Sequence, residues 1–187
     1  MKKITLFGVA LLFLVNSAKS QITFTVKPGL NLNGANFGYK TKNFVPYFGL
    51  QFLNLTDKFK DNNTDRKTKT HIYMPIIGSK IFIIDKESLK GLINATLFKP
   101  VIFGKEVENG EEDASYKEDF KSLKLWGGEL GFGSEYFFNE HFSFGGEFGF
   151  RFGFYNYKNE SNTSEFSYTE NMHLNMTYIS GSMNFYF

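Results

Sequence analysis

Residues 142–154 alternate between two kinds of side chain, and this alternation limits the possible folds of the chain more than any other feature. One face carries Phe142, Phe144, Phe148, Phe150, Phe152 and Phe154. The opposite face carries Ser143, Gly145, Glu147, Gly149, Arg151 and Gly153. Because successive side chains of a strand point to opposite faces, the pattern predicts a long β-strand between two different environments.

The same period of two recurs along the chain. In the preceding segment Trp126, Leu130, Phe132, Tyr136 and Phe138 alternate with Gly127, Glu129, Gly131, Gly133 and Glu135. The short polar link 139–141 joins both segments into a predicted hairpin. In all, the pattern predicts seven strands, at 22–32, 44–55, 70–84, 89–103, 122–138, 142–157 and 172–187. Asn33-Gly34 is predicted to be a turn, and Pro75 to mark a sheet edge, a bulge or a strand end. The stretches 56–69, 104–121 and 158–171 are predicted to be long polar connections.

The length of the strands decides which face is the core. A soluble β-sandwich also alternates, but its strands run about 5–6 residues, whereas a strand that crosses a bilayer needs about 9–11. The polar faces here consist mostly of Gly, Ser and Asn with isolated charges, which suits the crowded inside of a narrow barrel. We therefore expect the phenylalanines to face lipid and the sheet to close on itself, since lipid offers no partner to a free backbone group.

Several charged residues fall on the predicted inner face: Lys27, Glu129, Glu135, Glu147 and Arg151. Isolated charges inside a barrel would be costly, so we expect a paired interior network. The alternative is that these charges contact trapped water.

Composition excludes other classes of protein. Of the 187 residues 24 are Phe, and an aromatic content of 19% is too high for a disordered chain. The absence of Cys excludes a disulfide scaffold and a thiolate metal site. A formal net charge of +2 gives no support for a nucleic-acid partner.

Residues 1–20 have the layout of a secretory signal peptide. Lys2 and Lys3 precede an apolar run from Ile4 to Val15, and Ala18 and Ser20 are small residues before a predicted cut at Gln21. The run of about 12 apolar residues is short for a membrane anchor, which needs about 20. We expect a mature domain of residues 21–187 with a net charge of −1, because the predicted cut removes three lysines and no acid.

The chain ends on Phe187, with Phe185 two residues earlier and Gly181 six residues before the end. This ending resembles the C-terminal signal that the assembly machinery reads in bacterial outer-membrane barrels, with the glycine shifted by one position. Together with the segments 26–31, 71–76 and 135–143, it resembles the small outer-membrane β-barrel family, the porin-family or PorT-like group with OmpA-like or OmpX-like architecture. The resemblance implies an all-β, antiparallel up-and-down transmembrane barrel of about eight strands.

The strand count and the resemblance disagree by one. A barrel with both termini in the periplasm needs an even number of strands, and seven are predicted. A short additional strand is expected before residue 70, either at Asn36 to Thr41 or within 56–69.

Few residues suggest chemistry. His141 and Ser143 have the His-x-Ser spacing of the lipid A deacylase family, but they lie at the predicted periplasmic turn. The acidic residues of 104–121 (Glu106, Glu108, Glu111, Glu112, Asp113, Glu118 and Asp119) could bind a divalent cation, yet they lack the order of a calcium loop. His71 and His173 are lone histidines. We expect no catalytic, cofactor-binding or metal-binding residue, and we interpret Trp126 and the tyrosines near strand ends as membrane-interface anchors.

Three functions remain open. The first is a non-enzymatic monomer in the outer membrane with a filled interior, whose outer loops serve adhesion, partner binding or envelope integrity. Its expected partners are outer-membrane lipid and the barrel-assembly machinery, with no nucleic acid. The second is a soluble secreted or periplasmic barrel whose phenylalanines enclose an apolar ligand, and the third is a barrel enzyme that modifies lipid A.

Overall fold

The computed structural model describes residues 20–29, 32–61, 65–108, 111–113, 124–160 and 167–187. The predicted signal peptide therefore lies outside the described residues except for Ser20. Ten strands form one antiparallel sheet: β1 (Gln21–Lys27), β2 (Asn33–Lys40), β3 (Phe44–Lys60), β4 (Asp65–Lys86), β5 (Leu89–Phe98), β6 (Val101–Glu108), β7 (Glu111–Asp113), β8 (Lys124–Asn139), β9 (Phe142–Glu160) and β10 (Ser167–Tyr186). Within these ranges no helix is long and apolar enough to cross a membrane.

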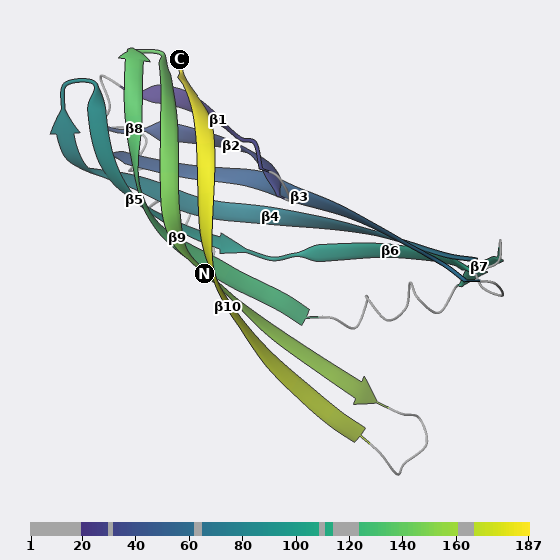
Figure 1. The fold of residues 1–187 in the computed structure, drawn as a ribbon. Coiled ribbons are helices and arrows are strands. Elements are labelled where there is room, and N and C mark those ends of the chain that lie inside the picture. Colours follow the sequence, from purple (N-terminus) through teal and green to yellow (C-terminus); the bar gives the residue numbers. More distant parts are fainter. Residues whose placement is uncertain (1–19, 30–31, 62–64, 109–110, 114–123, 161–166) are drawn as a thin grey trace, which may run out of the picture.

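Eight of the strands close into a barrel (Figure 1). Around the ring the order is β1, β2, β3, β4, β5, β8, β9 and β10, and β10 pairs again with β1. The predicted fold class, an all-β antiparallel barrel of eight strands, is confirmed. The missing strand is β2, which covers the first of the two places where it was expected.

The end of the barrel where β1 begins and β10 ends has short turns. Three links of two or three residues, 41–43, 87–88 and 140–141, connect the strands there. Lys42 and Glu87 adopt φ angles of 43° and 47°, as tight turns between antiparallel strands often require. Ile22 and Phe187 exchange two backbone hydrogen bonds of 3.1 and 2.9 Å at the same end. We call this the turn end and the opposite end the arm end.

The predicted boundaries of several strands are wrong. The strand expected at 22–32 stops at Lys27, because Pro28 has no N–H to continue the ladder. Asn33-Gly34 is not a turn: Gly34 lies in β2 and pairs with Lys27 and Gln51. The strand expected at 89–103 is broken between β5 and β6 at Lys99 and Pro100. Pro75 lies opposite that break, and its carbonyl accepts a 3.2 Å bond from the Lys99 N–H.

Two of the expected polar connections, 56–69 and 158–171, are much shorter than predicted, because the strands continue far beyond the barrel wall. Of the third, 104–121, residues 109–110 and 114–121 lie outside the described residues. β3 and β4 stay paired to Lys60 and Asp65, and β9 and β10 stay paired to Glu160 and Ser167. Figure 1 shows the two resulting ribbons leaving the barrel in different directions. The parts of β3, β4, β6 and β7 that extend beyond the barrel are called arm A. The parts of β9 and β10 that extend beyond it are called arm B.

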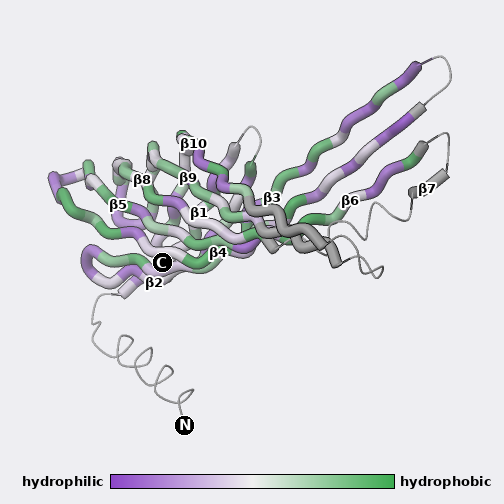
Figure 2. The backbone as a smooth tube through the Cα atoms, turned by 90° about the horizontal axis from the view of Figure 1, so that it is seen from below, coloured by the Kyte–Doolittle hydropathy of each residue, from purple (hydrophilic) through white to green (hydrophobic). Residues whose placement is uncertain are grey.

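The phenylalanine stripes face outward, as predicted. Phe144 and Phe148 are 45% and 48% exposed on the outside of β9, whereas Ser143 on the inner face of the same strand is 0% exposed. Figure 2 shows the corresponding alternation of hydrophobic and hydrophilic residues along the strands. The barrel therefore has an apolar outside and a largely polar inside, the reverse of a soluble protein.

Candidate functional site

The inside of the barrel holds two deeply buried carboxylate clusters, the first around Glu135 on β8. Glu135 is 1% exposed and forms a salt bridge with Lys80 of β4. Its other oxygen accepts hydrogen bonds from the Ser143 hydroxyl at 2.9 Å and the Tyr186 hydroxyl at 2.6 Å. Lys80 also donates to the side-chain oxygen of Asn184 at 3.1 Å. The carboxylate is thus paired and hydrogen-bonded, which offsets the cost of removing it from water.

The second cluster surrounds Glu147 on β9, nearer the arm end. The Lys27 ammonium lies 3.3 Å from Glu147 Oε2, and the Asn94 amide donates to both carboxylate oxygens at 2.9 and 3.2 Å. The Tyr178 hydroxyl donates to Oε1. Asn94 in turn accepts a 2.7 Å bond from the Tyr47 hydroxyl, so strands from opposite parts of the wall are tied together across the lumen.

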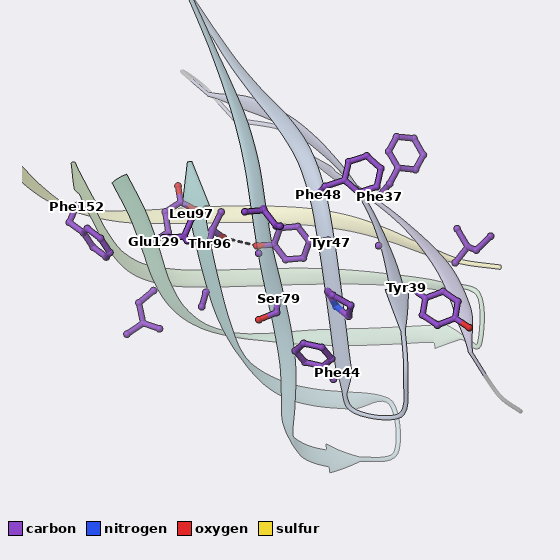
Figure 3. Close-up of a pocket in the computed structure, with 17 residues that line it drawn as sticks. Phe37, Tyr39, Phe44, Tyr47, Phe48, Ser79, Thr96, Leu97, Glu129 and Phe152 are labelled. Atoms are coloured by element: carbon purple, nitrogen blue, oxygen red, sulfur yellow. Dashed lines mark hydrogen bonds between the residues drawn. The ribbon is translucent and has the colours of Figure 1, made fainter. Parts of the chain in front are cut away.

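Tyr47 itself lies across the inside of the wall. Its neighbours on both adjacent strands are glycines, Gly38 and Gly78. A Cβ atom at Gly78 would lie 2.6 Å from the Tyr47 hydroxyl oxygen, so the ring needs the space that glycine leaves. Figure 3 shows the hydroxyl directed at Thr96, to which it lies 2.6 Å away.

A third ion pair joins Glu129 and Arg151. The Arg151 Nε donates to Glu129 Oε1 at 2.7 Å, and Nη2 donates to the same oxygen. The guanidinium carbon also lies 5.6 Å from the centre of the Tyr178 ring and 5.9 Å from that of Phe98, at cation–π distance. The predicted interior network of Lys27, Glu129, Glu135, Glu147 and Arg151 is therefore present.

Apolar side chains flank the ionic residues along the inside of the strands. Toward the turn end Val45, Phe82 and Leu92 form a buried cluster against which Phe137 packs. The Lys40 ammonium covers this end, 5.0 Å from the centre of the Phe137 ring. Toward the arm end a second cluster is formed by Tyr47, Met74, Ile76 and Phe98. Apolar and ionic side chains thus together fill much of the lumen, as expected for an eight-stranded barrel.

Among the described residues, an interior cavity of about 470 Å³ lies near the arm end. We call it the outer cavity. Its polar lining comes from Lys27, Gln51, Glu129, Arg151, Tyr178 and Ser180, and its apolar lining includes Pro28, Leu32 and Ile179. Gln51 Oε1 and Ser180 Oγ are buried there without a hydrogen-bond partner among the described residues.

The outside of the barrel has a hollow of a different kind. It measures about 960 Å³ and lies against β3, β4 and β5, where exposed apolar side chains such as Phe44, Phe48, Ile77 and Leu97 line it (Figure 3). Since these side chains belong to the outward face, the hollow is continuous with the apolar surface of the barrel.

His141 and Ser143 do not form the hydrogen-bonded pair that a serine nucleophile and its base require. Ser143 is fully buried and donates to Glu135, whereas the exposed His141 contacts the Tyr186 carbonyl through Nδ1 at 2.9 Å. No hydrogen bond connects the two residues in the described chain. A serine committed to a carboxylate and shielded from solvent is poorly placed to attack a lipid ester.

The remaining candidate ligands, the histidines and the acidic residues, do not come together in one site within the described residues. His71 contacts Asn54 at 2.7 Å on an exposed surface, and His173 packs edge-on against Phe154. Of the acidic stretch 104–121, residues 109–110 and 114–121 lie outside the described residues, and Glu106 accepts a 3.2 Å bond from Thr68. No group of three or more His, Asp or Glu residues in the described ranges could hold a metal ion.

The interpretation of the aromatic anchors is partly wrong. Trp126 is 53% exposed on the outside and stacks on Phe154 with ring centres 4.5 Å apart. Tyr186 ends a strand, but its side chain points inward because its hydroxyl binds Glu135. Tyr47 and Tyr178 likewise point into the lumen.

Sequence reasoning missed Lys80 and Asn94. The isoleucine runs around Lys80 hide the phase of β4, although Met74, Ile76, Gly78, Lys80 and Phe82 do alternate on its inner face. If Pro75 is placed inside a strand, the alternation of β4 predicts that Lys80 points into the barrel.

No protein-family model matches the chain, and no curated protein matches it. Three solved structures align with 90% of this chain, each with a TM-score below 0.5. Neisserial surface protein A is 14% identical with a TM-score of 0.42, covering 90% of this chain and 94% of that one. CarO of Acinetobacter baumannii is 10% identical with a TM-score of 0.41, over 90% and 96% of the two chains. A major outer membrane protein of Thermus thermophilus is 9% identical with a TM-score of 0.44, over 90% and 100%.

Proposed function

We propose that this protein is exported by residues 1–20 and that residues 21–187 span a bacterial outer membrane as a monomeric, non-enzymatic barrel. The C-terminal strand would be recognised by the barrel-assembly machinery. The interior conducts no solutes, and the role of the protein lies in arms A and B, through adhesion, partner binding or envelope integrity. The arms would stand outside the cell, because barrels of this kind have short periplasmic turns and long outer loops.

The observation that carries this proposal is the polarity of the wall. Phe148, Ile179 and Phe132 are about half or more exposed on the outside, where they are neighbours across three strands. In water such a surface would promote aggregation, whereas in a bilayer it faces hydrocarbon. The soluble alternative required these phenylalanines to enclose a ligand, and they lie on the other side of the wall.

The outward face also becomes polar where the barrel ends. On β4 the exposed Tyr73 is followed by His71, Lys69 and Lys67 at the outward positions toward arm A. With Trp126 on β8, Tyr73 marks one limit of the apolar band, as aromatic residues do at membrane interfaces. This pattern supports a membrane boundary near these residues, with the arms in water.

Fractionation tests the location. The protein should remain in the sarkosyl-insoluble envelope fraction and migrate faster on gels unless it is heated. Trypsin added to whole cells should cut arm A, which exposes Lys58, Lys60 and Lys67, while the rest of the barrel stays intact. Recovery in the soluble periplasmic fraction would refute the proposal.

Conductance tests the filled interior. Purified protein added to a planar lipid bilayer should give no stepwise current, because ion pairs and apolar clusters occupy the lumen. Stable conductance steps from the unmodified protein would contradict a closed interior without affecting the assignment to the membrane.

A further inference from the structure

Four lysines of arm A lie on the same face of its sheet. Lys58 of β3, Lys67 and Lys69 of β4 and Lys105 of β6 are exposed, and their places in the ladders put them side by side. We call these four residues the basic face. We propose that the basic face binds the phosphate groups of lipid headgroups at the membrane surface beside the barrel. The inference rests on the proposed function in placing the barrel wall in a bilayer and arm A in the water next to it.

The lysines of the basic face are direct neighbours across strands. Lys58 is paired with Lys67, and Lys69 is paired with Lys105. Like charges directly opposite one another in a sheet destabilise it. Bound anions would relieve this repulsion, so the arrangement favours a ligand that carries several negative charges.

The opposite face of arm A has a different character. On β4 it carries Arg66 and Thr68. The ladder partners of Thr68 are Asp57 on β3 and Glu106 on β6, and the Thr68 hydroxyl donates to Glu106 at 3.2 Å. None of the side chains that the structure describes on this face is a lysine. The lysines are therefore a property of one face and not of the whole arm.

The basic face continues the outside of the barrel wall. On β6 the outward neighbour of Lys105 is Phe103, and on β4 the outward positions lead from Lys69 through His71 to Tyr73. Tyr73 and Phe103 are 40% and 55% exposed, and their ring centres lie 5.8 Å apart. A surface that passes from exposed rings to lysines matches the boundary between acyl chains and anionic headgroups.

The heights of the lysines fit a headgroup layer. A strand advances about 3.4 Å per residue and crosses a bilayer at a tilt of about 45°. Along the membrane normal Lys105 therefore lies about 5 Å beyond Phe103, and Lys69 about 10 Å beyond Tyr73. The polar layer on each side of the hydrocarbon is about 5–8 Å thick, and a lysine stem can bend toward it. A soluble acidic partner would not require the lysines to be aligned with the lipid-facing wall, so lipid is the favoured occupant.

Native mass spectrometry of the protein in dodecyl maltoside would test the proposal. The probes are diphosphoryl lipid A, monophosphoryl lipid A and phosphatidylcholine, with inorganic phosphate and polyglutamate as competitors. We expect diphosphoryl lipid A to bind at least about tenfold more tightly than phosphatidylcholine, with monophosphoryl lipid A between them. The double variant Lys67→Gln with Lys69→Gln should lose at least about tenfold in affinity for diphosphoryl lipid A, because each cation near an anionic surface contributes about fivefold.

Arg66→Gln is the matched control, since Arg66 precedes Lys67 on the same strand, carries the same charge and lies on the opposite face. It should leave the affinity for lipid A unchanged, whereas Lys67→Gln alone should lower it about threefold. Equal losses in Lys67→Gln and Arg66→Gln would overturn the proposal, as would binding of phosphatidylcholine as tight as that of diphosphoryl lipid A.

The competitors distinguish the source of the negative charge. Displacement of lipid A by inorganic phosphate would show a site for free anions, and tighter binding of polyglutamate would assign the basic face to an acidic protein; both results would overturn a lipid site. Retention of lipid A in the presence of both competitors would support it. Fractionation is independent of these measurements, so the location in the membrane and the basic face can each fail alone.

Discussion

Glu129 and Arg151 are direct cross-strand partners on β8 and β9, and both side chains point into the barrel. The guanidinium reaches one carboxylate oxygen through two nitrogens, while Glu129 is almost completely buried. A pair in this setting stabilises little in comparison with apolar packing, but the loss of one member is costly because the other remains buried and charged.

We therefore expect Arg151→Leu to destabilise the barrel by about 3 kcal/mol, near the lower end of the range for broken buried pairs. The temperature at which the compact gel band converts to the unfolded band should fall. The double variant Glu129→Gln with Arg151→Leu should recover most of the loss, since no charge is left unpaired. Equal conversion temperatures for the original protein and the single variant would contradict the pairing.

Two glycines give a sharp test of inner and outer faces. A Cβ atom at the inward-facing Gly149 would collide with the Leu130 carbonyl oxygen and lie 2.6 Å from the Gly131 Cα, whereas one at Gly146 would meet nothing within 4 Å. Gly149→Ala should cost about 1–3 kcal/mol through overpacking, because the atoms in the way belong to the backbone. Gly146→Ala should be neutral or slightly stabilising. Urea unfolding measures both, and similar losses in the two variants would be incompatible with the described packing.

The period of two in the sequence predicted which faces of the strands are polar, because that alternation follows directly from strand geometry. It did not predict where the strands end. β3 and β4 remain paired through Lys58 and Lys67, since ladder hydrogen bonds join main-chain groups and do not depend on side-chain polarity. Pro28 predicts a strand end, but the alternation of the residues on both sides of it suggested one continuous strand.

The interior clusters could be predicted only in part. Glu147 and Arg151 were recognisable as inward charges from their own strand. Their partners were not all recognisable, because Asn94 meets Glu147 from 53 residues away and depends on the register between β5, β8 and β9. The outer cavity depends in addition on the early end of β1, which the expected strand at 22–32 did not contain.

A cationic substitution can locate the membrane. Phe148 lies outward between Phe132 and Ile179, in the middle of the apolar band. Phe148→Arg should cost about 2–4 kcal/mol when the protein unfolds from lipid vesicles, because the charge would face hydrocarbon. His71→Arg lies outward on β4 beyond this band and should cost well under about 1 kcal/mol by the same reasoning. Equal costs at the two positions would place Phe148 outside the bilayer.

Substitutions at Phe187 can distinguish the folding of the barrel from its assembly in the cell. Its backbone closes the barrel through two hydrogen bonds to Ile22, while its side chain is 71% exposed. Phe187→Ala should therefore refold in detergent with nearly unchanged stability, because the backbone pairing needs no ring. In cells the same variant should reach the outer membrane in reduced amounts if the assembly machinery reads the terminal aromatic residue. Phe187→Tyr keeps an aromatic ring and should restore the amount, as measured by immunoblot of envelope fractions; normal levels of the alanine variant would show that assembly does not depend on this side chain.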